Sequence, residues 1–176
     1  KRGTGLDTEV RYLAPNDRGT LHTYVLPDDQ LTGKNRGMVD WKQNGKMVWA
    51  ASGQSVTSYD LRWRRVSDDD YWKDFTRNLP STTPRLYDSH LHAEHQLNSR
   101  AWGLGSSQAS VYAGLQSWQT LKDLDPGADP ALSEVVAPYG RTQIGLSGRN
   151  TSETGLTWNI QSELNRFTNP DASKIT

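Results

Sequence analysis

The 176-residue chain has no cysteine, no long hydrophobic run and no excess of charge of either sign. The absence of cysteine excludes disulfide frameworks, thiol nucleophiles and cysteine-ligated zinc. The longest uninterrupted apolar run is Met47–Ala51, far short of the ~20 residues that a membrane-spanning helix needs. Because 20 Lys and Arg balance 20 Asp and Glu, the composition argues against a nucleic-acid partner.

Aliphatic residues and phenylalanine are also scarce. Leu, Ile, Val and Phe make up only about 18% of the chain, a level that is common in disordered proteins. Disordered chains are usually also highly charged and poor in aromatic residues, whereas this chain has seven Trp and seven Tyr. We therefore expect a folded protein, but one with too few aliphatic residues for a conventional two-sheet core.

Apolar and polar residues alternate with a period of two along much of the sequence, and helical periodicity is almost absent. The clearest alternating runs are 59–64, 87–97 and 156–164. Such runs predict antiparallel β-strands, about eight or nine in all, with one apolar and one polar face.

Turn residues separate the predicted strands. Turns are predicted at Pro15–Gly19, at Pro27–Asp29 and at Asn44-Gly45. Two longer connections, Ser67–Pro84 and Asp123–Pro138, are marked by proline. No linker or repeat divides the chain, which begins with Lys1, and we expect it to be an internal or processed piece of a longer protein.

Two architectures fit strands of this kind. In a soluble sandwich the apolar face packs on a second sheet, whereas in a membrane barrel it meets lipid and the polar face lines a wet lumen. The polar positions carry full charges along whole strands, and Trp and Tyr are the aromatic residues that membrane interfaces prefer. The residues alone favour the barrel and leave the sandwich open.

Several sequence words resemble the LPS-assembly protein family LptD, also called organic solvent tolerance proteins, in the early part of its outer-membrane barrel. The most specific are Val66–Phe75, which reads VSDDDYWKDF, and Tyr24–Asp29, which reads YVLPDD. The others, in the same order as in the family, are Arg11–Leu13, Arg36-Gly37, Trp41, Trp118–Asp123 and Ala137–Arg141. The resemblance covers nearly the whole chain, from about residue 2 to residue 165.

The resemblance implies an all-β fold in which antiparallel up-and-down strands form part of a large transmembrane β-barrel, open or incomplete in this chain. Residues 1–176 are then a single segment of the barrel domain, without the periplasmic domain and the C-terminal strands of the family. The disulfide-forming cysteines of the family lie in those other regions, which agrees with their absence here. An isolated segment of this length is not expected to transport anything by itself.

The resemblance also implies a function. LptD proteins lie in the outer membrane of Gram-negative bacteria and insert lipopolysaccharide into its outer leaflet, with the lipoprotein LptE as a plug in the lumen. They catalyse no covalent chemistry and need no cofactor. The chain is therefore expected to be barrel wall in contact with lipopolysaccharide, LptE and outer-membrane lipid, and not an enzyme.

The alternation divides the candidate site residues between two faces. Those expected to face the lumen, where they either contact sugar phosphates and the plug or form only a hydrated wall, are Asp60, Arg62, Arg64, His90, His92, Glu94, Asn159, Gln161 and Glu163. Those expected to face lipid or form an interface girdle are Tyr59, Leu61, Trp63, Leu156, Trp158 and Ile160. Trp118 is expected to face lipid too, although Trp63, Trp118 and Trp158 are also the residue type that stacks on sugars in a lectin.

Two polar clusters admit other interpretations, although we predict no metal site and no catalytic residue. His90, His92 and Glu94 share one face of a strand, as metal ligands would, but their spacing fits no known motif and no fourth ligand is evident. The run Asp68–Asp70 lacks the spaced acids, central glycine and distal glutamate of an EF-hand calcium loop. It is more simply a solvated loop, in which Asp70 caps the turn that follows.

Two rival functions stay open on the sequence alone. A soluble carbohydrate-binding β-sandwich predicts a shift of tryptophan emission when glycan is added. A metalloenzyme built on the histidine cluster predicts stoichiometric metal in the purified protein.

Overall fold

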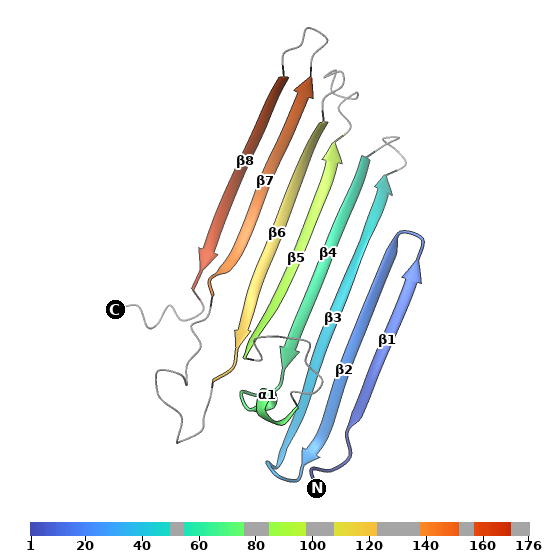
Figure 1. The fold of residues 1–176 in the computed structure, drawn as a ribbon, viewed down its shortest axis with the longest axis vertical. Coiled ribbons are helices and arrows are strands. Elements are labelled where there is room, and N and C mark those ends of the chain that lie inside the picture. The colour runs from blue at the N-terminus through green and yellow to red at the C-terminus, as the bar shows by residue number, and fades with distance from the viewer. Residues whose placement is uncertain (50–54, 76–84, 98–107, 123–137, 152–156, 170–176) are drawn as a thin grey trace, which may run out of the picture.

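The computed structural model describes residues 1–49, 55–75, 85–97, 108–122, 138–151 and 157–169 (Figure 1). These residues form eight strands and one short helix, in the order β1 (Leu6–Ala14), β2 (Asp17–Asp29), β3 (Lys34–Trp49), β4 (Ser55–Val66), α1 (Tyr71–Asp74), β5 (Leu86–Leu97), β6 (Gln108–Thr120), β7 (Gly140–Thr151) and β8 (Thr157–Thr168). None of the helices in these ranges is long and apolar enough to cross a membrane.

The eight strands make one sheet in which each strand pairs with the next along the chain (Figure 1). Every pair is antiparallel, so the up-and-down all-β fold predicted from the alternation is confirmed. The described strands do not divide into the two packed sheets of a sandwich. Instead, β1 and β8 are the two edges of an open sheet, each with a neighbour on one side only.

One face of the sheet is apolar, because directly opposed residues of antiparallel strands lie on the same face. The pairs Val10↔Leu21, Leu21↔Trp41 and Trp41↔Trp63 carry this face across β1 to β4. It continues to β8 through the paired residues Leu61↔Leu91, Leu91↔Leu115, Ala113↔Ile144 and Ile144↔Leu164. An apolar band therefore crosses all eight strands, and we call this side the apolar face.

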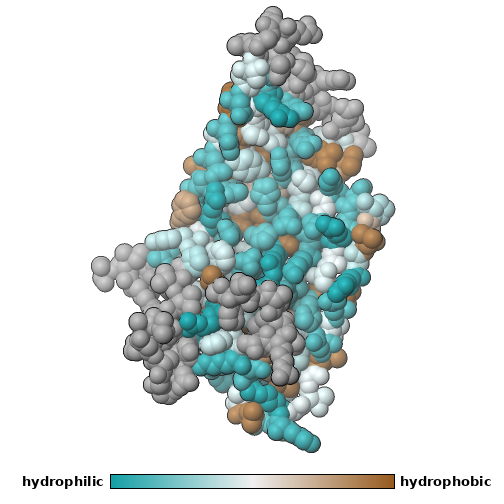
Figure 2. Space-filling view, in the orientation of Figure 1, coloured by the Kyte–Doolittle hydropathy of each residue, from teal (hydrophilic) through white to brown (hydrophobic). Residues whose placement is uncertain are grey.

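The opposite side, which we call the polar face, carries the alternate residues of the same strands. Figure 2 shows a surface that is mostly hydrophilic in the orientation of Figure 1. Representative pairs are Lys42↔Arg62 and Arg62↔His90 in the middle of the sheet. The period of two thus separates the two kinds of residue as the sequence predicts.

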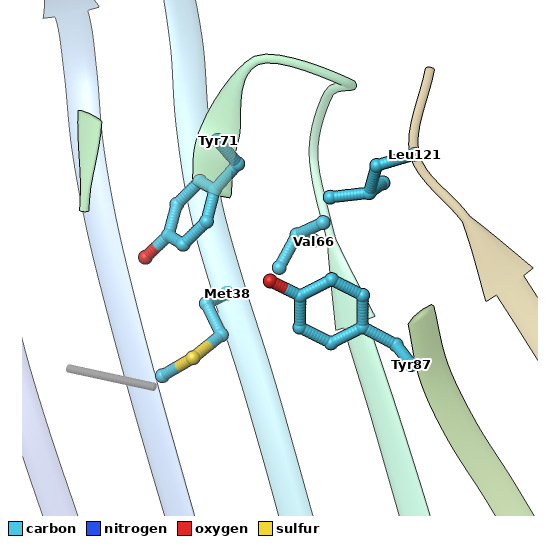
Figure 3. Close-up of a cluster of buried hydrophobic side chains, with 5 residues drawn as sticks. All are labelled: Met38, Val66, Tyr71, Tyr87 and Leu121. Carbon is cyan, nitrogen blue, oxygen red and sulfur yellow. The ribbon is translucent and has the colours of Figure 1, made fainter. Parts of the chain in front are cut away.

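The one compact hydrophobic cluster among the described residues lies at the end of the sheet that carries α1 (Figure 3). Its buried members are Met38, Val66, Tyr71, Tyr87 and Leu121, and Tyr24, Trp72 and Phe75 pack against them. Most other large apolar residues are exposed, among them Val10, Leu115 and Ile144 of the apolar face. The hydrophobic core is therefore small. Most of the large apolar side chains are exposed and can contact a partner molecule or a non-aqueous medium.

Two predicted turns have other structures. Asn44-Gly45 lies inside β3, where Gly45 pairs with Tyr59 and the tyrosine ring lies across it, so the prediction of a turn there is wrong. At Pro27–Asp29 the strand β2 continues to Asp29 with an irregularity in its pairing, and Asp28 has φ of 53°. The chain turns in the residues that follow, where the Thr32 N–H donates to the Asp29 carbonyl.

Tyrosine rings cover glycines on neighbouring strands at several places in the sheet. Gly19 lies under Tyr12, Gly45 under Tyr59 and Gly145 under Tyr112, and each glycine is paired with its tyrosine in the register. A Cβ atom built on Gly145 would lie 2.1 Å from Cζ of Tyr112. These glycines provide the space in which the rings lie flat on the sheet.

Replacing Gly145 by alanine is expected to destabilise the protein by about 1–3 kcal/mol through overpacking. The ring of Tyr112 must move, and its hydroxyl then loses the 2.6 Å hydrogen bond that it donates to Glu163. Urea-induced unfolding of the parent protein and of the Gly145→Ala variant measures this difference in stability. Gly148→Ala is the matched control on the same strand, because its Cβ would lie 3.4 Å from Trp158, an ordinary contact distance. Equal stability of the Gly145 and Gly148 variants would contradict the prediction.

Candidate functional site: the polar face and its ion pairs

The nine polar residues singled out in the sequence all belong to the polar face. Asp60 pairs with His92 and Arg62 with His90 between β4 and β5. Glu94 is opposite Tyr112, which is opposite Gly145, and Gly145 is opposite Glu163 on β8. The remaining members, Arg64, Asn159 and Gln161, occupy the same side of β4 and β8. That this face lines a lumen stays a prediction.

Several ionisable residues on the polar face lie next to an acidic side chain at a neighbouring position. His90 Nε2 lies 2.7 Å from Asp60 Oδ1, and His90 Nδ1 lies 3.5 Å from Asp88 Oδ2. Arg141 Nη2 lies 2.7 Å from Glu163 Oε1. At the β1 edge, His22 Nε2 lies 2.6 Å from Asp7 Oδ1. Except for His90 with Asp88, which are both on β5, these pairs join adjacent strands and so cross-link the sheet.

Asp40 is the most connected carboxylate in the middle of this face. It is nearly buried and lies 3.3 Å from Arg64 Nε, 3.8 Å from Arg62 Nε and 3.8 Å from Lys42 Nζ. Arg64 is fully buried and its guanidinium lies 5.8 Å from the centre of the Tyr87 ring. Arg64 is therefore a structural residue of the wall, whereas Arg62 and Asp60 are accessible from above the face.

Apart from Trp118, the residues predicted to face lipid lie on the apolar face wherever the structure describes them. Leu61 pairs with Leu91, Trp63 with Trp41, and Ile160 with Gly148. Tyr59 and Trp158 are on the same side of β4 and β8. Leu156 lies outside the described residues. Contact of this face with lipid is not tested by the geometry and remains a prediction.

Trp118 is an exception among the tryptophans. It pairs with Asp88 on the polar face, so its expected position on the lipid-facing side is wrong. Trp118 is at an even position of β6, whereas the odd positions, such as Leu115 and Ser117, belong to the apolar side. A tryptophan with a polar ring nitrogen fits a hydrated surface as well as an interface girdle.

The described residues hold no group of three or more His, Cys, Asp or Glu side chains arranged to bind a metal ion. His90, His92 and Glu94 share a face as predicted, but His90 is bonded to Asp60 and His92 lies 6.1 Å from the Tyr112 ring centre. Asp70 precedes α1, yet its side chain makes no capping hydrogen bond, so the predicted cap is wrong. Its carboxylate lies 3.6 Å from Lys73 Nζ instead.

An arginine that the sequence analysis did not select is the centre of the strongest ion-pair network. The side chain of Arg36, on β3, is only 2% exposed. It donates to Asp68 through Nε at 2.9 Å and through Nη2 at 2.6 Å, a two-pronged geometry that is strong for guanidinium and carboxylate. Arg36 Nη1 also donates to Asp74 and, at 3.4 Å, to the fully buried Asp29.

The network brings together residues from three of the sequence segments that resemble a known family. Asp29 ends the YVLPDD word, Arg36 begins the next one, and Asp68 and Asp74 lie in VSDDDYWKDF. Arg2 closes the network, donating at 2.9 Å to Asp29 and also to Asp74. Residues far apart in the sequence thus meet in one place, and the only sequence signal was the words themselves.

The network predicts how the Asp68 contact responds to acid. Burial alone would raise the pKa of Asp68, but the hydrogen bonds from Arg36 and Ser67 outweigh it and hold the pKa below its ordinary value. A lowered pKa contributes stability that is present above the unfolded value and is lost as pH falls through the folded value. We therefore expect the contact to be unchanged from neutral pH down to about pH 4 and to be lost only below it.

Near-ultraviolet circular dichroism of the aromatic side chains, recorded from pH 7 to pH 2, measures this transition. Asp68→Asn removes the titrating group and is the matched control, so the difference between the two curves reports on Asp68. A transition of the native protein between pH 5 and pH 7 that is absent from the Asp68→Asn variant would contradict the prediction.

The sequence matches no protein-family model. The LPS-assembly protein LptD of Polaromonas sp. strain JS666 is 32% identical over 170 residues, which cover 95% of this chain and 19% of the relative. The chain belongs to the LptD family.

Other LptD proteins match over similar lengths. The LPS-assembly protein LptD of Albidiferax ferrireducens is 29% identical over 185 residues, covering 99% of this chain and 21% of the relative. That of Alcanivorax borkumensis is 33% identical over 156 residues, covering 85% of this chain and 17% of the relative. The chain spans about a fifth of the length of the LptD relatives it matches, and the fold fits a segment of an LptD β-barrel.

Proposed function

We propose that this chain is part of the wall of an outer-membrane translocon that inserts lipopolysaccharide into the outer leaflet of a Gram-negative bacterium. The observation that carries the proposal is the two-faced sheet of an LptD relative, apolar across all eight strands on one side and ion-paired on the other. In this proposal the apolar face contacts outer-membrane lipid and the polar face contacts lipopolysaccharide and a lipoprotein plug of the LptE type. The wall performs no covalent chemistry.

The exposure of the apolar face supports the contact with lipid. Val10 is 53% exposed, Leu115 52% and Ile144 55%, although each lies in the middle of a strand. In water such a continuous apolar surface is costly, whereas in hydrocarbon it is the favourable state. Tyr59, Leu61, Trp63, Trp158 and Ile160 are the sequence-selected members of this proposed lipid-facing surface.

The open edges support membership of a larger barrel. The backbone groups on the outer sides of β1 and β8 have no neighbouring strand among the described residues. Unpaired backbone groups are not tolerated in hydrocarbon, so these edges require further strands when the sheet spans a membrane. We propose that residues 1–176 are one segment of the barrel domain and that strands elsewhere in the complete protein pair with β1 and β8.

The lengths of the connections between strands support one orientation of the sheet in the membrane. At one end of the sheet the strands are joined by Pro15-Asn16, 50–54, 98–107 and 152–156, and at the α1 end by 30–33, 67–85 and 121–139. Outer-membrane barrels have short turns on the periplasmic side and longer loops outside. The α1 end is therefore proposed to face the cell exterior.

Depletion of the complete protein in its own host tests the function. Newly made lipopolysaccharide is expected to stop reaching the cell surface, and large antibiotics are expected to enter the cells. Complementation with the intact gene should restore both properties, and a copy that lacks residues 1–176 should not. Undiminished surface lipopolysaccharide after depletion would remove the proposal.

A further inference from the structure

The segment Ser67–Phe75, which we call the strap, leaves β4 and lies across the polar face toward β2. It is attached to β3 at its start, where the Ser67 N–H donates to the Gly37 carbonyl at 2.9 Å. The Gly37 N–H donates in return to Ser67 Oγ at 3.0 Å. At the other end of the strap, the ring centre of Phe75 lies 5.2 Å from that of Tyr24 on β2. The strap therefore crosses from β4 over β3 to β2.

The underside of the strap is aromatic and well packed. Tyr71 is completely buried and faces the cluster that contains Met38, Val66 and Tyr87 (Figure 3). The ring centres of Tyr71 and Phe75 are 4.7 Å apart. Burial raises the pKa of the Tyr71 hydroxyl above its ordinary value, which is already well above physiological pH.

Arg36 joins this aromatic packing to the ion pairs already described. Its guanidinium lies 5.0 Å from the Phe75 ring centre and 5.9 Å from that of Tyr71, while its donors hold carboxylates at both ends of the strap. A guanidinium that stacks and bonds in two prongs cannot be replaced by a lysine without loss of contacts. One buried residue of β3 thus holds the strap at two points.

The strap also starts at a fork in the sheet. Backbone pairing between β4 and β5 ends at Arg62↔His90, although β4 continues to Val66. Beyond that point side chains replace the missing strand contacts. The Ser89 hydroxyl accepts from the Arg64 N–H at 3.1 Å, and the Gln119 amide accepts from the Val66 N–H at 3.0 Å and donates to its carbonyl at 2.9 Å. The root of the strap is therefore fixed by specific bonds.

We propose that the strap is a permanently docked constriction of the polar face, not a mobile gate, and that Arg36 is the positioning residue that holds it there. On the proposed function, which this inference presupposes, the strap narrows one end of the lumen on the side of β2 to β4. Its docking needs no ligand, because Asp68 and Asp74 are ion-paired with Arg36 and the rings of Tyr71 and Phe75 pack against residues of this chain.

Thiol labelling of the complete protein in outer-membrane vesicles tests the docking. Met38, which is 3% exposed beneath the strap, is replaced by cysteine. The reaction of this cysteine with a membrane-impermeant maleimide is followed over time. The label that the parent protein takes up under the same conditions is subtracted. Lys42→Cys, on the exposed part of the same strand and face, is the accessible reference. With Arg36 intact, the cysteine at position 38 is expected to react at least about tenfold more slowly than that at position 42.

The variant Arg36→Ala is expected to remove most of this protection, and Arg36→Lys is expected to keep part of it. Arg11→Ala is the matched control, because Arg11 is an exposed arginine of the same face whose Nε lies 2.5 Å from Glu9. It should leave the protection unchanged. Where Arg36→Ala fails to assemble, Asp68→Asn is used, since it removes the two-pronged contact and leaves the other carboxylates paired with Arg36.

Two results would overturn the inference. One is equal reactivity of the cysteines at positions 38 and 42 in the protein with Arg36 intact, and the other is full protection in both Arg36→Ala and Asp68→Asn. The heat-dependent change of gel mobility that an assembled barrel shows is measured on the same samples. Loss of that change in the parent protein would count against the proposed barrel, so the two failures are distinguishable.

Discussion

Replacement of Leu115 by arginine is expected to destabilise the membrane-assembled protein by about 2–4 kcal/mol. Leu115 lies in the middle of β6, on the apolar face, and is paired with Leu91. If this face contacts hydrocarbon, the new guanidinium must be buried in lipid near the midplane or must pull the strand toward the interface. The same effect is expected for Leu61→Arg, since Leu61 is opposite Leu91 on the other side.

The adjacent residue gives a close control. Gln116 follows Leu115 in the chain but lies on the polar face, opposite His90 and Arg141. Gln116→Arg adds the same charge at the same depth, at a partly exposed polar position, and is expected to change stability by about 0.5 kcal/mol or less. Urea titration of the barrel refolded into vesicles measures both variants. Equal losses at positions 115 and 116 would remove the assignment of the two faces.

Replacement of Arg36 by alanine is expected to cost about 3 kcal/mol of folding stability, the lower end of the range for breaking a buried ion pair. The change leaves Asp29 fully buried with only Arg2 as its cationic partner, and it takes the guanidinium from Asp68 and Asp74. The lower end applies because the side chains of Asp68 and Asp74 are 27% and 23% exposed and water can solvate part of their charge.

The comparison with Arg11→Ala isolates burial as the cause. Arg11 is 73% exposed at the side chain, and an exposed pair such as Arg11 with Glu9 contributes about 0–1 kcal/mol. Both variants are compared by their urea midpoints in vesicles at neutral pH. A midpoint for Arg36→Ala that equals that of Arg11→Ala would show that the network adds little to stability.

The strand architecture was predictable because its cause is local. The alternation of Tyr59, Leu61 and Trp63 with Asp60 and Arg62 assigns the faces of β4 from sequence alone, and the register agrees. The same periodicity predicts about eight or nine antiparallel strands, and the described residues form eight in chain order, since short connections favour pairing of neighbours.

The features that sequence did not reveal depend on contacts between distant residues. Asn44-Gly45 is a favourable turn pair, but the ring of Tyr59 uses the space above Gly45 and the strand continues through it. The network of Arg36 joins residues that are 7, 32 and 38 positions away from it, which no periodicity encodes. The face on which Trp118 lies was also not predictable, because a tryptophan fits either face of the sheet. Only the register with β5 assigns it to the polar face.

The cross-strand ion pairs of the polar face bear on how a charged polymer would move along it. The opposite charges of the cross-strand arginine–carboxylate pairs lie between 2.7 and 3.8 Å apart, so their fields cancel a short distance above the sheet. If this face lines a lumen as proposed, a polyanionic glycan passing over it would meet no deep electrostatic trap and no high barrier, which suits conduction because conducting sites must release as readily as they bind.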